Sequence, residues 1–378
     1  MATATKTAGY PRVAAMRQAL ASHRIDLLVL APTNNLRYTL GGFCPPGDER
    51  FCALLITPAG AALVIPALNL QQAREHTEGL TFFSYADADG PHAALNQGLR
   101  AVAAASPLAT VAVDEEMYAE HLLVLQAACR DAEFRLAGDV VGPLRSRKDA
   151  DEIAILREAA ATADAGVRAV FAACRPGVTE LELVEIAGAA MRAAGADGVA
   201  FGSVAAGPHT ALSHHAPGRA ALQAGDVVCV DIGSKLKGYC SDITRMGVVG
   251  GADPDPEFDR VQTLVEEAVR AALAVARPGA LARQVDEAAR GVISAAGYGE
   301  YFVHRTGHGL GLSVHEAPYI TGTSDLVLEE GMVFSIEPGI YLPGRFGCRW
   351  EEIVYLDASG ARVFSALPRV VQTSGSRV

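Results

Sequence analysis

Four acidic residues in the C-terminal half of the chain stand beside strand-like apolar segments. Asp231 closes one such segment and Glu337 closes another. Asp242 follows the first acid by 11 residues, and Glu351 follows the second by 14 residues. Clustered carboxylates repel one another in a low-dielectric core unless they are protonated, paired with bases or bound to cations. Two divalent cations would neutralise all four charges, so the pattern favours a metal site.

Histidines concentrate in the same half of the chain. Six of the ten lie between residues 209 and 315, and three of these belong to the Gly-rich stretch 304–316. Glycines around His308 allow a close approach of the backbone to a ligand or a metal. Carboxylates with one imidazole suit Mn²⁺, Co²⁺ or Fe²⁺, and Zn²⁺ less exclusively. Two such metals about 3.5–4 Å apart can share one water molecule and lower its pKa.

Each residue also has a simpler structural interpretation. Asp231 alone could be a turn acid at the end of a strand, and Asp242 could be a surface partner of Arg245. Glu351 and Glu352 are adjacent, and the pair alone does not show which acid faces inward. A single histidine is more often a hydrogen-bonded structural residue than a ligand. An internal repeat favours the metal site over these interpretations, because it places the acids at equivalent positions in two similar halves of the domain.

The repeat begins with two similar segments. RPGVTELELVEIAGAAMRAAG starts at Arg175, and RPGALARQVDEAARGVISAAG starts 102 residues later at Arg277. Each Pro-Gly turn leads into a helix that ends at a glycine, a common C-cap. At an offset of 106 residues the strands that follow align as well, and Asp231 falls on Glu337. Two such halves packed about a pseudo-two-fold axis would bring the acids together.

The elements before and between the repeats predict two domains. Alternating helical and strand-like patterns indicate an N-terminal α/β domain, with a helix at 11–22, strands at 27–30, 53–56, 61–65 and 111–113, and a helix at 118–129. A Pro/Gly turn makes the second and third strands a hairpin. Long helices are expected at 150–174 and 257–276. A polar segment broken by Gly and Pro places the boundary between domains 1–143 and 144–378.

Composition excludes several classes of protein. The chain has 378 residues and a formal net charge of −11, which argues against nucleic-acid binding, since that function needs a basic face. We expect no signal peptide and no membrane span, because no apolar stretch reaches about 18 residues. The seven cysteines form no CxxC pair, which favours free thiols in a reducing cytoplasm over disulfides.

Four blocks of the sequence carry a family resemblance: AGDVVCVDIGSKLKGYCSDITR, HRTGHGLGLSVHE, FSIEPGIY and GCRWEEIVYL. They resemble the signature blocks of the pita-bread metallopeptidases, and most of all the Xaa-Pro dipeptidase (prolidase) and aminopeptidase P branch. The resemblance covers about residues 150–365. It implies an α+β pita-bread (creatinase/aminopeptidase-like) catalytic domain with a pseudo-two-fold internal repeat, preceded by the α/β N-terminal domain of that branch.

The resemblance implies a metal-binding role for five residues that match the family in order and spacing: Asp231, Asp242, His308, Glu337 and Glu351. Asp231 would bind one metal, and Asp242 and Glu351 would bridge two metals. His308 and Glu337 would complete the other site. The pattern GxRxE assigns the bridging role to Glu351, the first acid of the adjacent pair.

Further roles follow from the same resemblance. Glu337 would also carry a proton from the water to the leaving amine. His214 would help to stabilise the tetrahedral intermediate, with His215 as a competing candidate, and His315 would be a further catalytic group. Substrate-binding roles fall on His304, His315 and Arg349. Trp350 replaces a residue that is often aliphatic in the family, which could reshape the pocket, and the loop Gly42–Phe51 is a candidate to touch substrate.

The implied activity is hydrolysis of the Xaa-Pro peptide bond in dipeptides by two divalent metal ions, with Mn²⁺ placed before Co²⁺, Zn²⁺ and Fe²⁺. The partner would be a small peptide with proline in the second position. Two alternatives stay open, an aminopeptidase P that accepts longer peptides and a metal-dependent lyase or hydrolase of small zwitterions. The N-terminal domain would control substrate length and supply contacts of a cytoplasmic homodimer.

Overall fold

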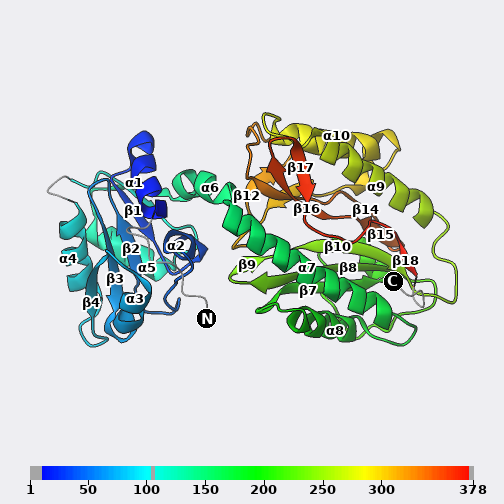
Figure 1. Ribbon diagram of the computed structural model, residues 1–378, viewed down its shortest axis with the longest axis horizontal. Coiled ribbons are helices and arrows are strands. Elements are labelled where there is room, and N and C mark those ends of the chain that lie inside the picture. The colour runs from blue at the N-terminus through cyan, green and yellow to red at the C-terminus, as the bar shows by residue number, and fades with distance from the viewer. Residues whose placement is uncertain (1–10, 104–106, 374–378) are drawn as a thin grey trace. The chain divides into compact units, whose positions relative to one another are not determined.

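The computed structural model describes residues 11–103 and 107–373, and it divides into two compact units, Met1–Arg145 and Ser146–Val378 (Figure 1). The elements of the first unit are α1 Pro11–His23, β1 Leu27–Leu30, α2 Asn34–Thr39, β2 Ala53–Ile56, β3 Ala61–Pro66, η1 Ala67–Asn69, α3 Leu70–His76, β4 Thr81–Tyr85, α4 His92–Val102, β5 Thr110–Val113, α5 Ala119–Ala128, β6 Glu133–Leu136 and α6 Gly138–Ser146. The predicted α/β domain, its hairpin and both of its predicted helices are confirmed.

A mixed six-stranded sheet of order β4-β3-β2-β1-β5-β6 forms the centre of the first unit. Strand β1 pairs antiparallel with β2 and parallel with β5. Its four residues are all apolar and all buried, which explains the uninterrupted apolar run in the sequence. Leu27 and Val29 face a core that includes Leu95 and Leu99 of α4 and Leu125 of α5. This packing accounts for the alternation of helices and strands along the chain.

One element of the first unit differs from the sequence expectation. Helix α6 covers most of the Gly- and Pro-broken segment at which we placed the domain boundary, and Pro143 lies inside the helix. Val140 and Val141 at its start are each only 1% exposed. Burial of these two side chains outweighs the low helix propensity of Gly and Pro.

The second unit contains the repeat. Its elements are α7 Ala150–Ala173, α8 Glu180–Ala193, β7 Gly198–Ala206, η2 Gly207–Ala211, β8 Val227–Leu236, β9 Tyr239–Cys240, β10 Ile243–Val248, α9 Phe258–Val275, α10 Ala282–Ala295, η3 Gly299–Tyr301, β11 Gly307–Gly309, β12 Glu316–Ile320, β13 Val333–Ile336, β14 Gly339–Leu342, β15 Phe346–Arg349, β16 Glu352–Asp357, β17 Gly360–Val363 and β18 Gln372–Thr373. The long helices α7 and α9 confirm the two predictions.

The two halves of this unit are built alike. In Figure 1, α7 and α8 lie beside the sheet β18-β10-β8-β7, and α9 and α10 lie beside the sheet β12-β11-β13-β16-β17. Isolated backbone bridges join Thr179 to Ala221 in the first half and Leu281 to Val327 in the second. Thr179 and Leu281 are 102 residues apart, and Ala221 and Val327 are 106 residues apart, which are the two offsets of the sequence repeat. The predicted internal repeat is therefore confirmed in the backbone.

Local sequence sets the ends of the repeated helices. Thr179 caps α8: its hydroxyl accepts from the amide of Glu182 at 3.2 Å, and the Glu182 carboxylate accepts from the Thr179 amide at 2.8 Å. Gly195 and Gly297 follow α8 and α10 with φ of +106° and +89°, a conformation that L side chains rarely adopt. The predicted glycine stops are thus confirmed.

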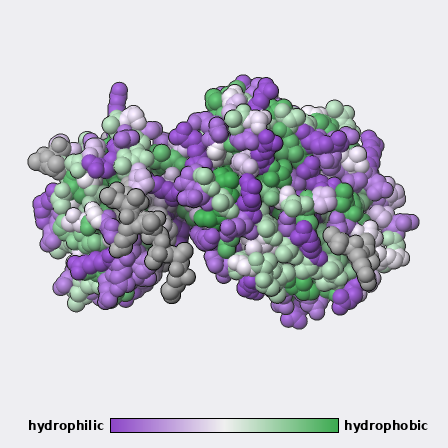
Figure 2. Space-filling view, in the orientation of Figure 1, coloured by the Kyte–Doolittle hydropathy of each residue, from purple (hydrophilic) through white to green (hydrophobic). Residues whose placement is uncertain are grey.

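The face of the molecule drawn in Figure 2 mixes hydrophilic and hydrophobic side chains. Within residues 11–103 and 107–373, no helix has both the length and the apolar character needed to cross a membrane.

Candidate metal centre

The first two acids are held by neighbouring antiparallel strands. Asp231 lies within β8 opposite Thr244 of β10, and Asp242 immediately precedes β10. Side chains two residues apart on a strand share one face of the sheet, so Asp242 and Thr244 point to the same side. The sheet register therefore brings the carboxylates of Asp231 and Asp242 to one place.

The other three candidate ligands come from the second sheet. Glu337 directly follows β13 and Glu351 directly precedes β16, and these two strands are antiparallel with Ile336 opposite Glu352. His308 lies on β11, which also pairs with β13. The two acids thus occupy adjacent strand ends, and the histidine lies on the neighbouring strand.

Short distances connect all five candidate ligands. His308 Nε2 lies 3.2 Å from Glu337 Oε1 and 3.8 Å from Asp242 Oδ2. The Thr244 hydroxyl donates to Glu351 Oε2 at 2.8 Å and lies 3.2 Å from Asp231 Oδ1. Ligand atoms of Asp242, His308 and Glu351 all lie within 4.8 Å of one another. The five side chains that the sequence singled out therefore meet at one point, where the two sheets approach.

The charges of this cluster are unbalanced. Burial, together with the charges of Glu351, Asp231 and Glu337, raises the pKa of Asp242 well above its ordinary value. Burial and the charges of Glu337 and Asp231 raise the pKa of Glu351 to about 8. Asp242 Oδ1 and Glu351 Oε1 are buried and find no hydrogen-bond partner in the described part of the chain, residues 11–103 and 107–373. Buried carboxylate oxygens without partners are costly, and a bound cation would satisfy them.

The donor set fits divalent metal ions. Four carboxylates and one imidazole offer hard oxygen ligands with a single nitrogen, as Mn²⁺, Co²⁺ and Fe²⁺ prefer. The histidine is oriented for this purpose, because His308 Nδ1 contacts the Gly309 carbonyl at 3.0 Å and leaves Nε2 directed at the acids. The two orphaned oxygens on Asp242 and Glu351 belong to the residues expected to bridge two metals.

Arg349 contacts one of the candidate ligands and two hydroxyl groups beside them. Its Nη2 donates to Asp231 Oδ2 at 2.6 Å, its Nη1 to the Tyr341 hydroxyl at 2.8 Å, and its Nε to the Thr244 hydroxyl at 3.1 Å. Burial would raise the pKa of Glu337, but His308 and Arg349 lower it to about 2. Because all three nitrogens of Arg349 already have protein partners, the geometry favours ligand positioning over direct contact with substrate.

A cavity of about 860 Å³ opens beside the cluster. Its lining includes His214, His304, His308 and His315 together with Asp231 and Glu337. Burial and the neighbouring His308 lower the pKa of His315 to about 4, so this imidazole is neutral at neutral pH. His304 Nε2 contacts the Tyr341 hydroxyl at 2.8 Å. The histidines expected at the substrate thus surround one space large enough for a peptide.

The two competing histidines differ in their surroundings. His214 is exposed towards the cavity. His215 also lines the cavity, but its Nε2 lies 2.8 Å from Oε2 of the buried Glu180. This engagement favours His214 as the group that is free to meet a substrate.

The adjacent acids Glu351 and Glu352 face different surroundings. Glu352 Oε1 accepts from Arg245 Nη2 at 2.8 Å and from Arg369 Nη1 at 2.8 Å. Arg245 is therefore the partner of Glu352 and not, as one simple interpretation had it, a surface partner of Asp242. The acid that reaches the cluster is Glu351, as the GxRxE pattern implies.

Two other sequence candidates have contacts within their own units. Trp350 is completely buried in the hydrophobic core, and its Nε1 donates to the Gln262 carbonyl at 3.2 Å, so it does not line the pocket. In the loop Gly42–Phe51, Arg50 pairs with Asp48 at 3.2 Å and with Asp87 at 3.0 Å inside the first unit.

Sequence reasoning missed two hydroxyl groups that organise the site. Thr244 contacts Asp231, Glu351 and Arg349, and Tyr341 joins Arg349 to His304. The available signals were positional: Thr244 lies two residues after Asp242 on one strand, and Tyr341 belongs to the FSIEPGIY block.

Comparisons with known proteins agree with this geometry. Residues 154–358 match Metallopeptidase family M24, and residues 12–147 match the Creatinase/Prolidase N-terminal domain. The chain belongs to metallopeptidase family M24. The predicted place in the pita-bread metallopeptidases is confirmed, together with the two-domain fold class and the assignment as a metallopeptidase.

Three individual proteins illustrate the similarity. The probable dipeptidase PepE of Mycobacterium tuberculosis is 42% identical over 355 residues, which cover 93% of this chain and 92% of that protein. The Xaa-Pro dipeptidase of Lactobacillus helveticus is 33% identical over 358 residues, covering 93% and 95%. The crystal structure of a prolidase from Thermococcus sibiricus has a TM-score of 0.89 at 34% identity, covering 97% of this chain and 100% of that one.

Proposed function

We propose that this chain is an Xaa-Pro dipeptidase that uses two divalent metal ions. The observation that carries the proposal is the convergence of five ligating side chains beside a peptide-sized cavity, with the buried oxygens Asp242 Oδ1 and Glu351 Oε1 left without partners. The names of the similar proteins support the substrate class, because relatives over the full chain are called dipeptidases and Xaa-Pro dipeptidases.

The proposed ligands divide between two metal positions. Asp231 would hold one ion, His308 and Glu337 would hold the other, and Asp242 and Glu351 would contribute a carboxylate to both. We place Mn²⁺ first, with Co²⁺, Zn²⁺ and Fe²⁺ as further candidates, since availability decides among metals at carboxylate-rich sites. When bound, the metals supply a water of lowered pKa and polarise the peptide carbonyl.

Glu337 is the proposed proton carrier. Its carboxylate lies beside the cavity and the other candidate ligands, and an ionised carboxylate there can accept a proton from the attacking water. Its Oε1 already accepts from the Ser335 hydroxyl at 3.0 Å, which leaves Oε2 to hold the proton. As the C–N bond breaks, Glu337 delivers this proton to the proline nitrogen, and the water oxygen stays on the carbonyl carbon.

The histidines around the cavity bind and stabilise the reacting groups. We assign to His214 and the neutral His315, which both line the cavity, N–H hydrogen bonds to the carbonyl oxygen as it becomes negative. His304, oriented by the Tyr341 hydroxyl, forms part of the substrate pocket. Arg349 keeps Asp231 and Thr244 in position, and we propose this role in place of direct substrate binding.

The proposal also covers the N-terminal domain, the assembly and the location. Domain 1–143 would limit the length of substrate and contribute contacts in a homodimer. Leu123 and Leu136 in this part of the chain are 64% and 62% exposed, and a subunit interface would bury such side chains. All seven cysteines are unpaired, which supports a reducing cytoplasm.

The test is proline release from Ala-Pro and from Ala-Pro-Ala by metal-stripped protein reloaded with Mn²⁺. The proposal predicts cleavage of the dipeptide at least about tenfold faster in kcat/KM, a ratio that corresponds to 1.4 kcal/mol of transition-state binding. Comparable cleavage of the tripeptide would move the assignment to an aminopeptidase P. If neither peptide is cleaved while two metals remain bound, the peptidase proposal fails in favour of a small-zwitterion lyase or hydrolase.

A further inference from the structure

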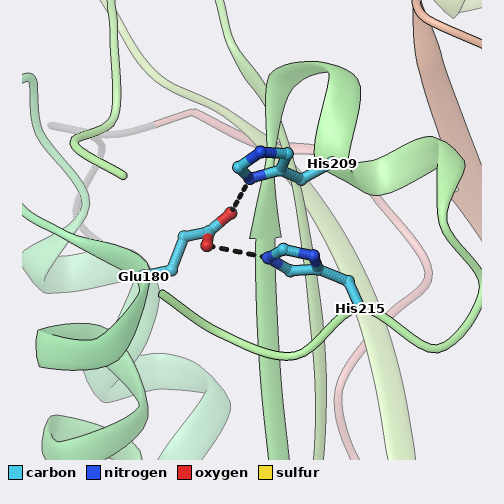
Figure 3. Close-up of side chains that lie close together, drawn as sticks. All are labelled: Glu180, His209 and His215. Carbon is cyan, nitrogen blue, oxygen red and sulfur yellow. Dashed lines mark hydrogen bonds and ion pairs between the residues drawn. The ribbon is translucent and has the colours of Figure 1, made fainter. Parts of the chain in front are cut away.

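A second cluster of ligating side chains lies outside the five-residue centre. Glu180 is the first residue of α8, His209 belongs to η2, and His215 lies in the loop that follows (Figure 3). Glu180 Oε1 lies 2.8 Å from His209 Nδ1, and Glu180 Oε2 lies 2.8 Å from His215 Nε2. The imidazole rings stack on the same side of the carboxylate, with centroids 4.5 Å apart. The start of α8 and the η2 segment with its following loop therefore direct their ligand atoms at one point.

The carboxylate of this cluster is buried and held in place by the backbone. The Glu180 side chain is 0% exposed. Its Oε1 accepts from the Ala206 amide at 3.1 Å, and its Oε2 accepts from the Gly218 amide at 3.1 Å. Groups that orient a metal-binding carboxylate act in this way. Each oxygen keeps a second lone pair, and these face the two histidines.

Glu180 is a buried anion in need of a positive partner. Its carboxylate contacts the amides of Ala206 and Gly218 and one ring nitrogen of each histidine. Within residues 11–103 and 107–373, its ion-pair partners are the two histidines and no Lys or Arg. A buried charge of this kind is stabilised by a cation.

The spacing of the ligand atoms suits a single metal ion. One atom each from Glu180, His209 and His215 lie within 4.8 Å of one another. Zn²⁺ binds imidazole nitrogen and carboxylate oxygen at about 2.0–2.2 Å, and two histidines with one glutamate form a known type of zinc site with an open fourth position. The proton on each ring nitrogen that faces Glu180 can move to the other nitrogen, which frees a lone pair without changing the net charge.

We propose that Glu180, His209 and His215 bind one Zn²⁺ ion at a site separate from the five-residue centre. Solvent reaches this site because the His209 side chain is 42% exposed. The ion joins the start of α8 to η2 and to the loop, and so restrains the backbone beside His214, which lines the cavity. The proposal concerns ion binding alone and stands whether or not the chain cleaves Xaa-Pro peptides.

The first experiment counts zinc ions. Metal-free wild-type protein and the variants His209→Ala and His23→Ala are dialysed against Zn²⁺, and the bound metal is measured per chain. His23 is an exposed histidine on α1 and serves as the matched control. We expect His209→Ala to bind one ion fewer than the other two proteins, or to bind that ion at least about tenfold more weakly, since loss of even an orienting partner costs 10–100-fold in affinity. Equal zinc content and affinity in all three proteins would overturn the proposal.

A second experiment uses a variant without a working five-residue centre, so that zinc bound at the two sites can be told apart. In the double variant Asp242→Ala, Glu351→Ala the five-residue centre is disabled, and we expect one Zn²⁺ per chain to remain and to raise Tm. Adding His209→Asn, a smaller change at a half-exposed position, should abolish both the bound zinc and the shift in Tm. A double variant that is folded by circular dichroism but binds no zinc contradicts the proposal. If the double variant does not fold, the zinc count on the wild-type background decides.

Discussion

Arg349 donates from Nη2 to Oδ2 of Asp231 at 2.6 Å, the shortest of the hydrogen bonds that its guanidinium makes beside the candidate metal centre. Two others go to the Tyr341 and Thr244 hydroxyls at 2.8 Å and 3.1 Å. A planar guanidinium can make these three contacts at fixed angles, whereas an ammonium group cannot. Arg349, at the end of strand β15, thus fixes the position of the Asp231 carboxylate on strand β8.

The first prediction concerns Arg349→Lys. The variant keeps the positive charge beside Asp231 but loses the contacts with Tyr341 and Thr244. Because partners that orient metal ligands are worth about 10–100-fold in metal affinity, we expect Mn²⁺ activation to require about 10–100-fold more metal. The measurement is a Mn²⁺ titration of the metal-stripped protein, followed by activity.

Arg345→Lys is the matched control for this variant. Arg345 pairs with Asp255 and Glu257 at the surface and is 44% exposed. We expect its activation curve to coincide with that of the wild type. An unchanged curve for Arg349→Lys would show that this arginine does not position the ligands.

The second prediction separates Trp350 from catalysis. Trp350 is fully buried in the core and donates to the Gln262 carbonyl. Trp350→Phe removes this hydrogen bond and leaves a small void, so we expect a loss of about 1–3 kcal/mol in the free energy of unfolding. Urea unfolding measures the loss, and KM for a dipeptide should stay within about twofold, which is about 0.4 kcal/mol. A changed KM with unchanged stability would place Trp350 at the pocket after all.

The third prediction concerns the stability of the metal-free protein as pH changes. In this state the folded pKa of Glu351 is about 8, against an ordinary value of 4.5. Between these two pH values the folded chain binds more protons than the unfolded chain. Stability is therefore greatest at the acid end of this window and falls as pH rises, by at most about 1.4 kcal/mol per pH unit from this group. Asp242 acts in the same direction, since its pKa is also raised.

The measurement for this prediction is Tm at several pH values between 5 and 8, with and without Mn²⁺. Bound metal keeps the carboxylates ionised, so we expect the decline with pH to disappear in the loaded protein. In the metal-free Glu351→Gln variant the slope should be shallower than in the wild type. A metal-free Tm that rises with pH through this window would be the opposite of the expected sign.

The repeat in the sequence predicted that the acids converge, because it supplied the register of the strands beside them. Aligning the two halves at an offset of 106 residues places Asp231 on Glu337; in the structure Asp231 lies within β8 and Glu337 directly follows β13. The fold class followed from the same repeat and from the family blocks. To align the acids of one half with those of the other, only the strand pattern and the offset between the halves are needed, and both are visible in a single sequence.

Features that depend on long-range packing were beyond sequence reasoning. Thr244 and Tyr341 carry common hydroxyl side chains, and their role appears only when Arg349 is placed between them. Glu180 is 29 residues from His209 and 35 from His215, with no motif to join them. The pocket role considered for Trp350 rested on its departure from the family pattern, and only the packing of the chain shows that this side chain lies in the hydrophobic core.

The most direct test of the central claim compares the adjacent variants Glu351→Gln and Glu352→Gln. Glu351 reaches the metal cluster through Thr244, whereas Glu352 is paired with Arg245 and Arg369. Loss of a bridging ligand should reduce proline release by at least about 100-fold, more than the loss of an orienting partner. Glu352→Gln should lower stability, because a buried charge pair is broken, while activity of the folded fraction stays within a few-fold.

The measurement is proline release from Ala-Pro by each variant in Mn²⁺, normalised to folded protein, with the number of bound metals counted in parallel. The account predicts loss of activity and of bound metal in Glu351→Gln alone. Wild-type activity in Glu351→Gln, or loss of metal-dependent activity in a folded Glu352→Gln variant instead, would contradict it.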